Sequence, residues 1–544
     1  MRYLLSPIPS LLPEQRGIHS YLSRSKNDTP RRTTMMSQLD DLHGSLLRTP
    51  TGKAEDELER TASEYRPLHS FKLDREKSYQ QQFADMYFLR LTKIKPAVEQ
   101  RASEAWRDTI IGDEPAKKVE RVLDIRQGEL CWVSGTVYMD MALKPNILED
   151  VSKDRWISAP ISNNKYYADD GSDAVTLEDE SGRIRLVGDF LKDVILVTGC
   201  IVAVLGTENA NGELEVIDLK FPDLPPQPDR WAVSKPPTAN GKSRSKKPKD
   251  EDEDEEMTDA QPKGRGGKIA IVSGLGFSGQ DASYALELNL LLEYLLGEAL
   301  DPTAQRELSQ ISRLIIAGNS ISLEERQPVD EDPAEKKTTD QKKYGYDSSS
   351  YNALPSQLLD EFLSALLPTI PITLLPGAQD PANASYPQQP IHPAMFPLSR
   401  AYTAAPGSAE SGWLDTVTNP WEGEIDGWRV LGTGGQNVDD IFKYVGSDDR
   451  LGMMEAMCRW RCCAPTAPDT LWSYPFQDDD PFVMHTCPHL YFVGCQPEFG
   501  TKVIQGGDGQ AVRLIAVPSF SATREIVLVD SETLGVSRIK ITTG

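Results

Sequence analysis

A chain of 544 residues is longer than one hydrophobic core usually supports, so we expect two or three folded units. Its 82 acidic residues outnumber its 58 Lys and Arg, and the net charge of -24 excludes a protein that carries most of its own affinity for nucleic acid. No apolar stretch reaches the ~20 residues that a membrane-spanning helix needs, so no membrane partner is expected. The 7 cysteines, scattered without a secretory signal, indicate a reducing compartment.

Residues 1–66 are rich in Ser, Thr, Pro and Arg and lack sustained periodicity, which predicts a disordered N-terminal tail. The arginine-rich start of this tail is typical of a transit peptide. The alternative, which we favour over a genuine organelle signal, is that translation begins at Met35 or Met36 and the residues upstream extend the gene model.

Residues 67–119 form the next predicted unit, an N-terminal helical segment. Between Ser78 and Ala102, apolar residues recur at spacings of three and four, which predicts a helix whose one apolar face packs on its own domain. Pro96 is expected to end or kink the first part of this helix.

Residues 120–232 read as short strands separated by turn residues. We expect strands at Leu130–Met139, at Ala174–Gly188 as a hairpin, at Cys200–Gly206 and at Glu213–Leu219. Five short strands of this kind predict an OB-fold barrel. An OB-fold that binds single strands needs a basic groove with stacking aromatic residues, whereas this stretch carries many acids, so we favour a structural OB-fold.

Residues 233–267 are predicted to be a charged flexible linker. Basic residues between Lys242 and Lys249 are followed by an unbroken run of acids from Asp250 to Glu256. Two interpretations remain open: the basic run is a nuclear localisation signal, or the two runs neutralise each other in a solvated linker.

Residues 268–544 hold four apolar runs of strand length that begin at Ile269, Leu314, Ile372 and Leu490. Each run ends at a glycine, which lets the backbone turn tightly. This pattern predicts an α/β sheet whose loops gather at one edge, where a reaction would take place.

Two helices are expected to cover this sheet. The first begins at an N-cap, Asp281, runs to about Leu300, and is apolar around most of its circumference. The second runs from Pro355 to Leu367. Residues 324–351 mix charges with Ser and Tyr and are expected to interrupt the fold as a mobile loop.

Histidine and cysteine side chains are the strongest candidates for metal ligands in this sequence. His485, Cys487 and His489 offer three candidate ligands, but Pro488 prevents a regular helix there and no second pair of ligands lies at zinc-finger spacing. We therefore expect structural histidines, His392 included. Three further cysteines share a predicted helix and are expected to be buried small side chains: Cys458, Cys462 and Cys463.

The stretch Gly274–Gly279 has the spacing Gly-x-Gly-x-x-Gly after a strand and before a helix, which is the context of a dinucleotide-binding motif. No acidic residue ends a second strand at the expected offset. Nucleotide binding is therefore not expected, and no cofactor is predicted.

Five short motifs that contain glycine or proline occur in the C-terminal half: Gly318–Ser320, Pro376–Pro381, Gly432–Phe442, Ala464–Leu471 and Cys487–Phe492. Together they resemble the non-catalytic B-subunits of replicative DNA polymerases, most closely those of polymerase delta, and the resemblance runs from about Ser70 to the C-terminus. It implies an OB-fold barrel joined to an inactive calcineurin-like metallophosphoesterase α/β sandwich.

In active calcineurin-like phosphoesterases the corresponding loops carry Asp-x-His, Gly-Asp-x-x-Asp, Gly-Asn-His-Asp and Gly-His-x-His. Two bridged divalent ions need several such carboxylates and imidazoles. Here only Asp380 and Asn319 offer metal donors, so the resemblance implies a dead site without catalytic residues, metal or cofactor. The residues of its vestigial loops are Ser273, Leu275, Asn319, Ser320, Ala378, Gln379, Asp380, Cys495 and Gln496.

The resemblance implies a scaffold that acts in DNA replication and repair in the nucleus. Its expected partners are the cysteine-rich C-terminal module of the polymerase delta catalytic subunit and a third subunit, with the sliding clamp and DNA reached only indirectly. The alternative is an active metal-dependent phosphodiesterase or nuclease, which the substituted ligands disfavour. Candidate interface anchors, each of which burial in the core would also explain, are Trp413, Trp421, Trp428, Trp460 and Trp472.

Overall fold

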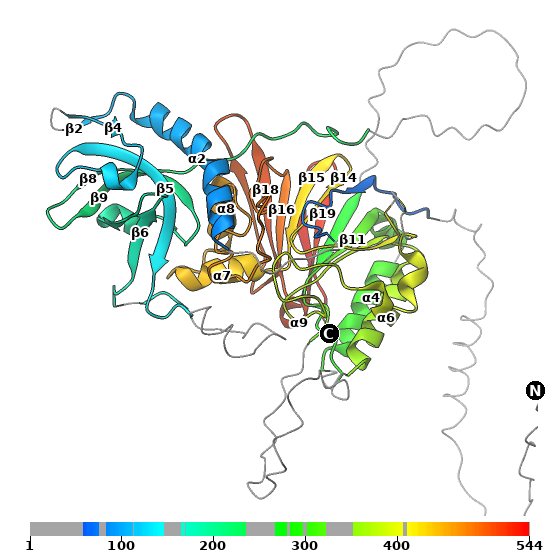
Figure 1. Ribbon diagram of the computed structural model, residues 1–544. Helices are drawn as coiled ribbons and strands as arrows, with labels where there is room; N and C mark the ends of the chain where they lie inside the picture. The colour runs from blue at the N-terminus through cyan, green and yellow to red at the C-terminus, as the bar shows by residue number, and fades with distance from the viewer. Residues whose placement is uncertain are drawn as a thin grey trace, which may run out of the picture. The chain divides into compact units, whose positions relative to one another are not determined.

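The computed structural model describes residues 58–74, 83–111, 114–145, 165–168, 170–235, 267–279, 283–297, 302–322, 352–405, 408 and 411–542. These residues contain three six-stranded sheets and one two-stranded sheet. In Figure 1 one of the six-stranded sheets forms a barrel, and the other two pack against each other between helices. Most of the predicted tail, the charged runs of the predicted linker and the predicted loop 324–351 lie outside the described residues.

The predicted OB-fold barrel is confirmed. Its sheet has the order β4-β5-β6-β7-β9-β8, and β5 also pairs with β8, which closes it. The apolar side chains that alternate along these strands fill the barrel and leave the charged ones outside. The strands are β4 (Lys117–Lys118), β5 (Leu130–Asp140), β6 (Ala174–Glu178), β7 (Arg183–Val187), β8 (Ile201–Glu208) and β9 (Glu213–Lys220). A small hairpin, β2 (Ile110–Ile111) with β3 (Glu114–Pro115), and two 3-10 turns, Val122–Asp124 and Asp189–Asp193, accompany the barrel.

The predicted N-terminal helix is α2 (Ala84–Trp106), which packs on β5 and β8 of the barrel. Its buried face repeats at helical spacing through Ile94, Val98 and Ala102. Pro96 lies inside the helix and does not end it, and Figure 1 shows α2 changing direction along its length. No helix among the described ranges combines the length and the apolar character needed to span a bilayer.

The first sheet of the C-terminal half has the order β13-β12-β11-β10-β19-β20, with its first four strands parallel. These strands are β10 (Lys268–Val272), β11 (Ile311–Ala317), β12 (Ile372–Leu375), β13 (Leu414–Thr416), β19 (Glu525–Asp530) and β20 (Val536–Lys540). Helices α4 (Ala285–Leu296), α5 (Pro302–Leu308) and α6 (Leu354–Leu366) pack on its outer face. Helix α4 is shorter than predicted, and the predicted cap Asp281 and end Leu300 lie outside the described residues.

The expectation of one sheet for all four apolar runs is wrong, because the run at Leu490 is β16 (Leu490–Gln496) of a second sheet. Both sheets are buried on two faces, so their strands show the same apolar pattern and the pattern cannot separate them. The second sheet has the order β1-β14-β15-β16-β18-β17, with β1 (Tyr65–Pro67), β14 (Trp421–Ile425), β15 (Trp428–Thr433), β17 (Gly500–Gln505) and β18 (Ala511–Pro518). On its outer face lie α7 (Gln436–Tyr444) and α8 (Arg450–Arg459).

The two sheets pack face to face around a shared apolar core that includes Ile271, Ile315, Phe492 and Ile515. The layer order is therefore helix, sheet, sheet, helix. Short elements complete this half: α9 (Phe520–Thr523) and the 3-10 turns Pro393–Met395 and Ser399–Tyr402. Cys462 and Cys463 follow α8 rather than lying on it, a difference from the prediction, but both are buried as expected.

The barrel and the sandwich share one hydrophobic core, which runs from barrel strands to α7, α8 and β16. At their junction the Arg90 guanidinium of α2 donates to the Asp480 carboxylate at 2.8 Å and to the Pro465 carbonyl at 2.7 Å, and both charged side chains are buried. The described residues from Glu59 onward accordingly form a single compact unit. This arrangement fixes the barrel against the sandwich.

A strap of residues 221–235 continues from β9 across the sandwich, where the sequence predicted the end of the barrel domain and the start of a linker. The Gln227 amide donates to the carbonyls of Ala511 at 2.7 Å and Pro488 at 3.1 Å. Asp223 accepts a hydrogen bond from Arg459 at 2.5 Å. The strap is therefore part of the junction.

Residues 58–74 are also attached to the sandwich, which corrects the predicted boundary of the tail at residue 66. The Arg60 guanidinium donates to the carbonyls at the ends of α4 and α5. In β1, the Tyr65 hydroxyl donates to Asp415 at 2.5 Å, and the Arg313 guanidinium lies 3.7 Å from the centre of the Tyr65 ring. Polar side chains that contact the sandwich occur only every few residues in this segment and give no periodic pattern in the sequence. The sequence therefore did not predict that the segment belongs to the fold.

Candidate functional site

The loops that follow strands of both sheets meet at one place, whereas the sequence predicted that they gather at one edge of a single sheet. Gly318, after β11, has a φ of +86°, and a Cβ there would lie 3.0 Å from Gly434 and 3.2 Å from Gly377. A Cβ on Gly494, near the end of β16, would lie 2.0 Å from the Ala317 carbonyl oxygen. Glycine is required at both positions because the backbones approach too closely for any side chain. This convergence is the candidate site.

Ser273, which follows β10, joins the two sheets at this site. Its hydroxyl donates to the Pro518 carbonyl at 3.0 Å and accepts from the Cys495 N–H at 2.8 Å. Cys495 has a left-handed φ of +55°, which is costly for a residue other than glycine and is held by that contact. Desolvation by burial raises the pKa of the Cys495 thiol, so it carries little of the thiolate that a nucleophile needs.

Asp380 is the one carboxylate among the predicted loop residues, and it holds backbone rather than an ion. Its two oxygens accept from the N–H groups of Ile321 at 2.9 Å and Gly377 at 2.7 Å, and the side chain is buried. Burial raises its pKa to about 6, against the backbone hydrogen bonds, which lower it. Asp380 therefore ties the loop after β11 to the loop after β12.

Asn319 makes a second tie between these loops. It adopts a left-handed φ of +49°, and its amide oxygen accepts from the Gln379 N–H at 3.0 Å. Leu275 and Ser320 are fully buried nearby, whereas Ala378 is exposed. The predicted loop residues are thus brought together, and their polar atoms bond chiefly to the main chain.

A network of side-chain amides fills the space between the loops and was not singled out from the sequence. Asn419 donates to Gln388 and to Gln436, each at 2.9 Å, and accepts from the Tyr386 hydroxyl at 3.0 Å. Gln388 also reaches the Gly377 carbonyl at 3.1 Å. The sequence contained little indication of this network, because single Asn and Gln residues spread over some fifty positions form no motif.

Gln496 completes the set of predicted residues. It is fully buried, and its amide nitrogen donates to the Gly494 carbonyl at 3.1 Å. Its amide oxygen faces Arg450, which forms an ion pair with Asp439 at 2.7 Å. Neutral amides and one structural carboxylate are poor ligands for a pair of divalent ions, which prefer several anionic oxygens.

A pocket of about 370 Å³ opens over these loops. Its walls include Gly274, Asn319, Gln379 and Ser519, and its cation is Arg524, which faces the Glu287 carboxylate at 3.6 Å. Among the described residues no group of three or more His, Cys, Asp or Glu side chains is arranged to hold a metal ion. The polar side chains of these loops are engaged mainly in hydrogen bonds that hold the loops together.

The sequence of this half and of the barrel matches known families. Residues 269–501 match the family model of the DNA polymerase alpha/epsilon B-subunit, and residues 82–219 match the DNA polymerase delta subunit OB-fold domain. The chain is 33% identical over 493 residues to the DNA polymerase delta small subunit of Saccharomyces cerevisiae, which covers 86% of this chain and 91% of that relative. The chain belongs to the DNA polymerase delta small subunit family.

Other members of the family show the same extent of likeness. The DNA polymerase delta small subunit of Arabidopsis thaliana is 34% identical over 486 residues, 89% of this chain and 97% of the relative. The DNA polymerase delta subunit 2 of Drosophila melanogaster is 31% identical over 475 residues, 87% of this chain and 96% of the relative. The family resemblance expected from the loop motifs is confirmed.

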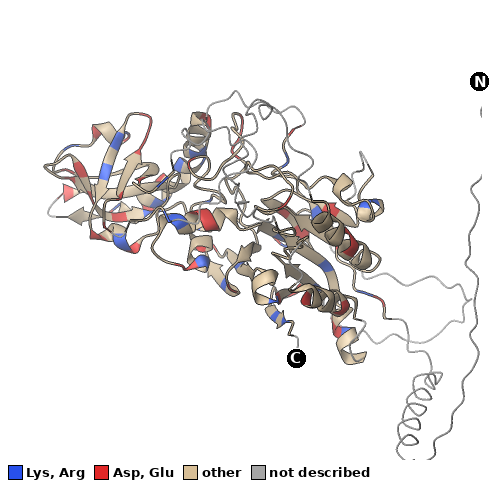
Figure 2. Cartoon of the chain, turned by 90° about the horizontal axis from the view of Figure 1, so that it is seen from below, with Lys and Arg blue, Asp and Glu red and all other residues tan. Residues whose placement is uncertain are grey.

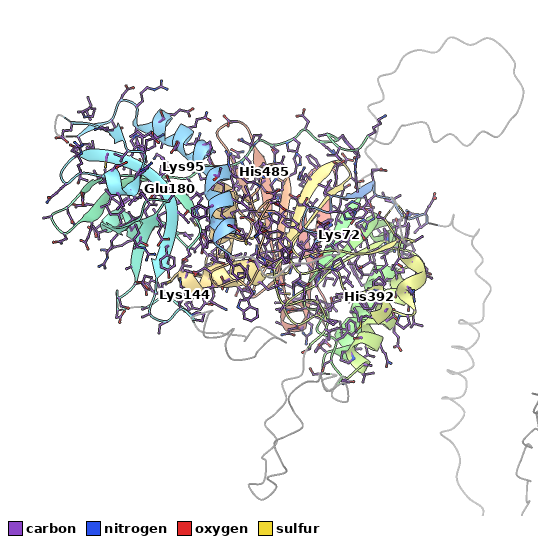
Figure 3. The ribbon with its side chains drawn as sticks, viewed as in Figure 1. Lys72, Lys95, Lys144, Glu180, His392 and His485 are labelled. Carbon is purple, nitrogen blue, oxygen red and sulfur yellow. The ribbon has the colours of Figure 1, made fainter. Side chains whose placement is uncertain are left out.

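Two of the histidines considered as metal ligands, His392 and His489, instead form hydrogen bonds with nearby backbone groups. His392 accepts from the Ala394 N–H at 3.1 Å and caps a 3-10 turn. His489 accepts from the Arg429 N–H at 3.1 Å and packs edge-on against Trp428. Figure 3 shows His392 and His485 in separate parts of the molecule.

The surface of the barrel carries charges of both signs, which Figure 2 shows interspersed rather than gathered into a basic face. On the barrel, Arg183 pairs with Glu178 at 3.0 Å and Arg185 faces Glu213 at 3.7 Å. Cations neutralised in this way are poorly placed to follow a phosphate backbone. This favours the structural OB-fold expected from the sequence.

Proposed function

We propose that this chain is the accessory, non-catalytic small subunit of a DNA polymerase delta assembly, and that its activity is architectural. The observation that carries the proposal is the shared core of barrel and sandwich, fixed by the buried Arg90 and Asp480 pair. A rigid body that presents two domains in one orientation suits a scaffold, because little ordering entropy is lost when partners bind.

The sandwich is, on this proposal, a calcineurin-like phosphoesterase fold whose site is vestigial. The support is the convergence of the strand-end loops that carry the predicted residues Ser273, Leu275, Asn319, Ser320, Ala378, Gln379, Asp380, Cys495 and Gln496. The side chains of Ser273, Asn319, Asp380 and Gln496 form hydrogen bonds there with backbone groups. No observation favours the nuclease alternative. With Mn²⁺ present, the purified chain should leave an activated phosphodiester and single-stranded DNA intact.

The proposed partners are the cysteine-rich C-terminal module of the catalytic subunit and the third subunit of the assembly. The sliding clamp and DNA are reached through those partners, which fits an acidic chain of net charge -24. The proposed role in replication and repair is exercised in the nucleus. The names of the relatives support the assembly, and the individual partners rest on the family resemblance.

The test is the identity of the proteins that co-purify with the tagged endogenous chain. We expect a catalytic polymerase subunit in near-equal amount, retained when nuclease treatment removes DNA. A matched bait with Arg90→Met, which loosens the junction of barrel and sandwich, should retain less of it. Recovery of the chain alone, or with proteins unrelated to a polymerase, would refute the proposal.

A further inference from the structure

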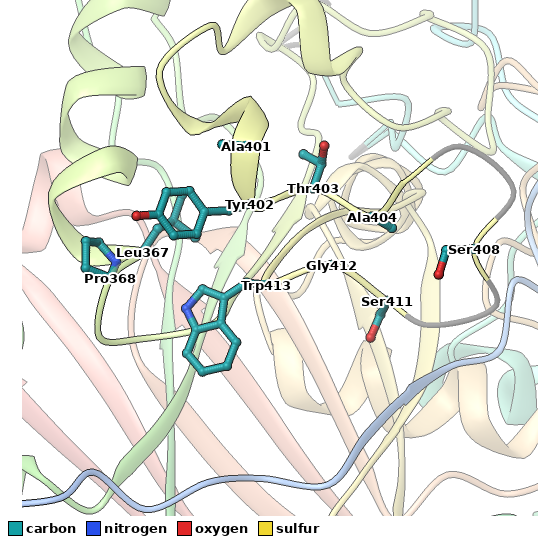
Figure 4. Close-up of a pocket in the computed structure, with 10 residues that line it drawn as sticks. All are labelled: Leu367, Pro368, Ala401, Tyr402, Thr403, Ala404, Ser408, Ser411, Gly412 and Trp413. Atoms are coloured by element: carbon teal, nitrogen blue, oxygen red, sulfur yellow. The ribbon is translucent and has the colours of Figure 1, made fainter.

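A second pocket lies beside the starts of β12 and the edge strand β13, and it shares no lining residue with the pocket over the strand-end loops. It has a volume of about 490 Å³, within the range of roughly 300–1,000 Å³ that ligand sites usually occupy. Figure 4 shows Tyr402, Pro368 and the Trp413 indole grouped at one end, and Ser408 and Ser411 at the other. Trp413 is 47% exposed, which is unusual for the largest apolar side chain.

The backbone holds the two aromatic residues in place. Tyr402 ends a 3-10 turn on one arm of a loop, and Trp413 precedes β13 on the other arm. A Cβ on Gly412 would lie 2.3 Å from the Ala404 nitrogen, so the two arms touch only because this residue is glycine. The Trp413 carbonyl accepts from the Ile372 N–H at 2.9 Å, which ties this arm to β12. The site is therefore built before any ligand arrives.

The chemistry of the lining restricts the ligand. No Lys, Arg, Asp, Glu or His lines the pocket among the described residues, although the chain as a whole has a net charge of -24. A single-stranded nucleic acid needs cations beside the stacking rings, and a cationic ligand such as methyl-lysine needs a fuller aromatic cage. The described lining suits a neutral ligand, one with flat apolar faces for the rings and carbonyl groups for the indole N–H and the Ser411 hydroxyl.

We propose that this pocket, defined by Pro368, Tyr402, Ser408, Ser411 and Trp413, binds a proline-containing extended segment of another protein. Such segments form a left-handed polyproline helix before binding, so they lose little entropy, and their rings pack on aromatic side chains. Their exposed carbonyls accept from the Trp413 indole N–H and from the Ser411 hydroxyl. The proposal does not depend on the polymerase assembly.

The test uses the full-length chain and fluorescein-labelled octaproline, followed by fluorescence anisotropy. We expect saturable binding that Trp413→Ala weakens by about tenfold or more, because the main stacking surface and a donor are both lost. Trp413→Phe should retain part of the affinity, since the ring remains without its N–H. Leu398→Ala is the matched control: Leu398 is 58% exposed near Tyr402 but does not line the pocket, so binding should be unchanged.

Two comparisons complete the test. An eight-residue Gly-Ser peptide should not bind, and unlabelled octathymidylate should not compete with octaproline. Equal binding of the two peptides, equal affinity of the wild-type chain and Trp413→Ala, or competition by the oligonucleotide would each overturn the proposal. Thermal unfolding of each variant shows that it is folded, and if Trp413→Ala unfolds early, Trp413→Phe decides.

Discussion

Asp380 illustrates how a carboxylate in a loop that follows a buried strand can serve the fold. Its carboxylate accepts two backbone N–H groups from different loops, and Cys495 and Asn319 keep costly left-handed conformations beside it. The motif Gly377-Ala378-Gln379-Asp380 was recognisable from the sequence because glycine turns after apolar runs are local signals. The Asn419, Gln388 and Gln436 network was not, because only the tertiary fold brings these residues together.

Asp380 should make folding stability depend on pH. Its pKa of about 6 lies above the ordinary value of ~3.9, so the unfolded chain releases this proton first. The stability that this group contributes is therefore complete below about pH 4 and is lost as the pH rises to about 6, a change of roughly 2–3 kcal/mol. Urea unfolding of the wild-type chain should show this fall, and Asp380→Asn should lack it. Identical pH profiles for both chains would contradict the assignment.

Arg90 should be the residue whose loss most weakens the junction of barrel and sandwich. Removing the guanidinium leaves Asp480 buried without a partner, so Arg90→Met should lower the free energy of unfolding by about 3–5 kcal/mol. The control is Lys93→Met, since Lys93 pairs with the exposed Asp479 and such surface pairs contribute about 0–1 kcal/mol. Adding Asp480→Asn to Arg90→Met should recover part of the loss. Equal effects of Arg90→Met and Lys93→Met in chemical denaturation would show that the junction does not depend on this pair.

At the scale of elements, strands and helices with strong patterns were predicted well and irregular segments were not. The barrel strands and α6 lie within a few residues of their predicted positions, because alternation and helical spacing are local properties. The strap 221–235 and the segment 58–74 contact the sandwich through scattered side chains such as Gln227 and Arg60. Contacts of this kind give no periodic pattern from which the segments could be predicted. The division into two sheets was missed for a related reason, since buried strands of either sheet look alike.

Deletion of the charged runs from Lys242 to Glu256 should leave the melting temperature unchanged. The deleted residues lie between the described strap, which ends at Lys235, and the strand that begins at Lys268, and because blocks of like charge stay solvated they are expected to bury no apolar surface. Differential scanning calorimetry of the deleted and full-length chains measures this. A loss of several degrees would contradict the linker interpretation, whereas loss of nuclear accumulation alone would support a localisation signal in the Lys/Arg run.

At the scale of the whole molecule, the shared core is the feature that links fold to function. The barrel and the sandwich bury residues such as Val137 and Tyr491 in the same cluster, and α2 and the strap reinforce the contact. Independent domains would move relative to each other, since ordinary interdomain interfaces are small and polar. Local patterns in the sequence indicated both domains, and the family resemblance implied that the two are joined. The residues that join them could not be predicted, because contacts between distant segments such as Arg90 and Asp480 leave no local pattern.

The most direct test of the scaffold proposal is co-expression of this chain with the cysteine-rich C-terminal module of the polymerase delta catalytic subunit. Gel filtration at micromolar concentration should give one peak that contains both in equal amounts, because stable interfaces bury about 1,200–2,000 Å² or more. Asp380→Asn, which alters only the strand-end loops, should assemble normally. Separate elution of the two proteins, with the third subunit also failing to bind, would contradict the proposal that this molecule acts by holding a polymerase assembly together.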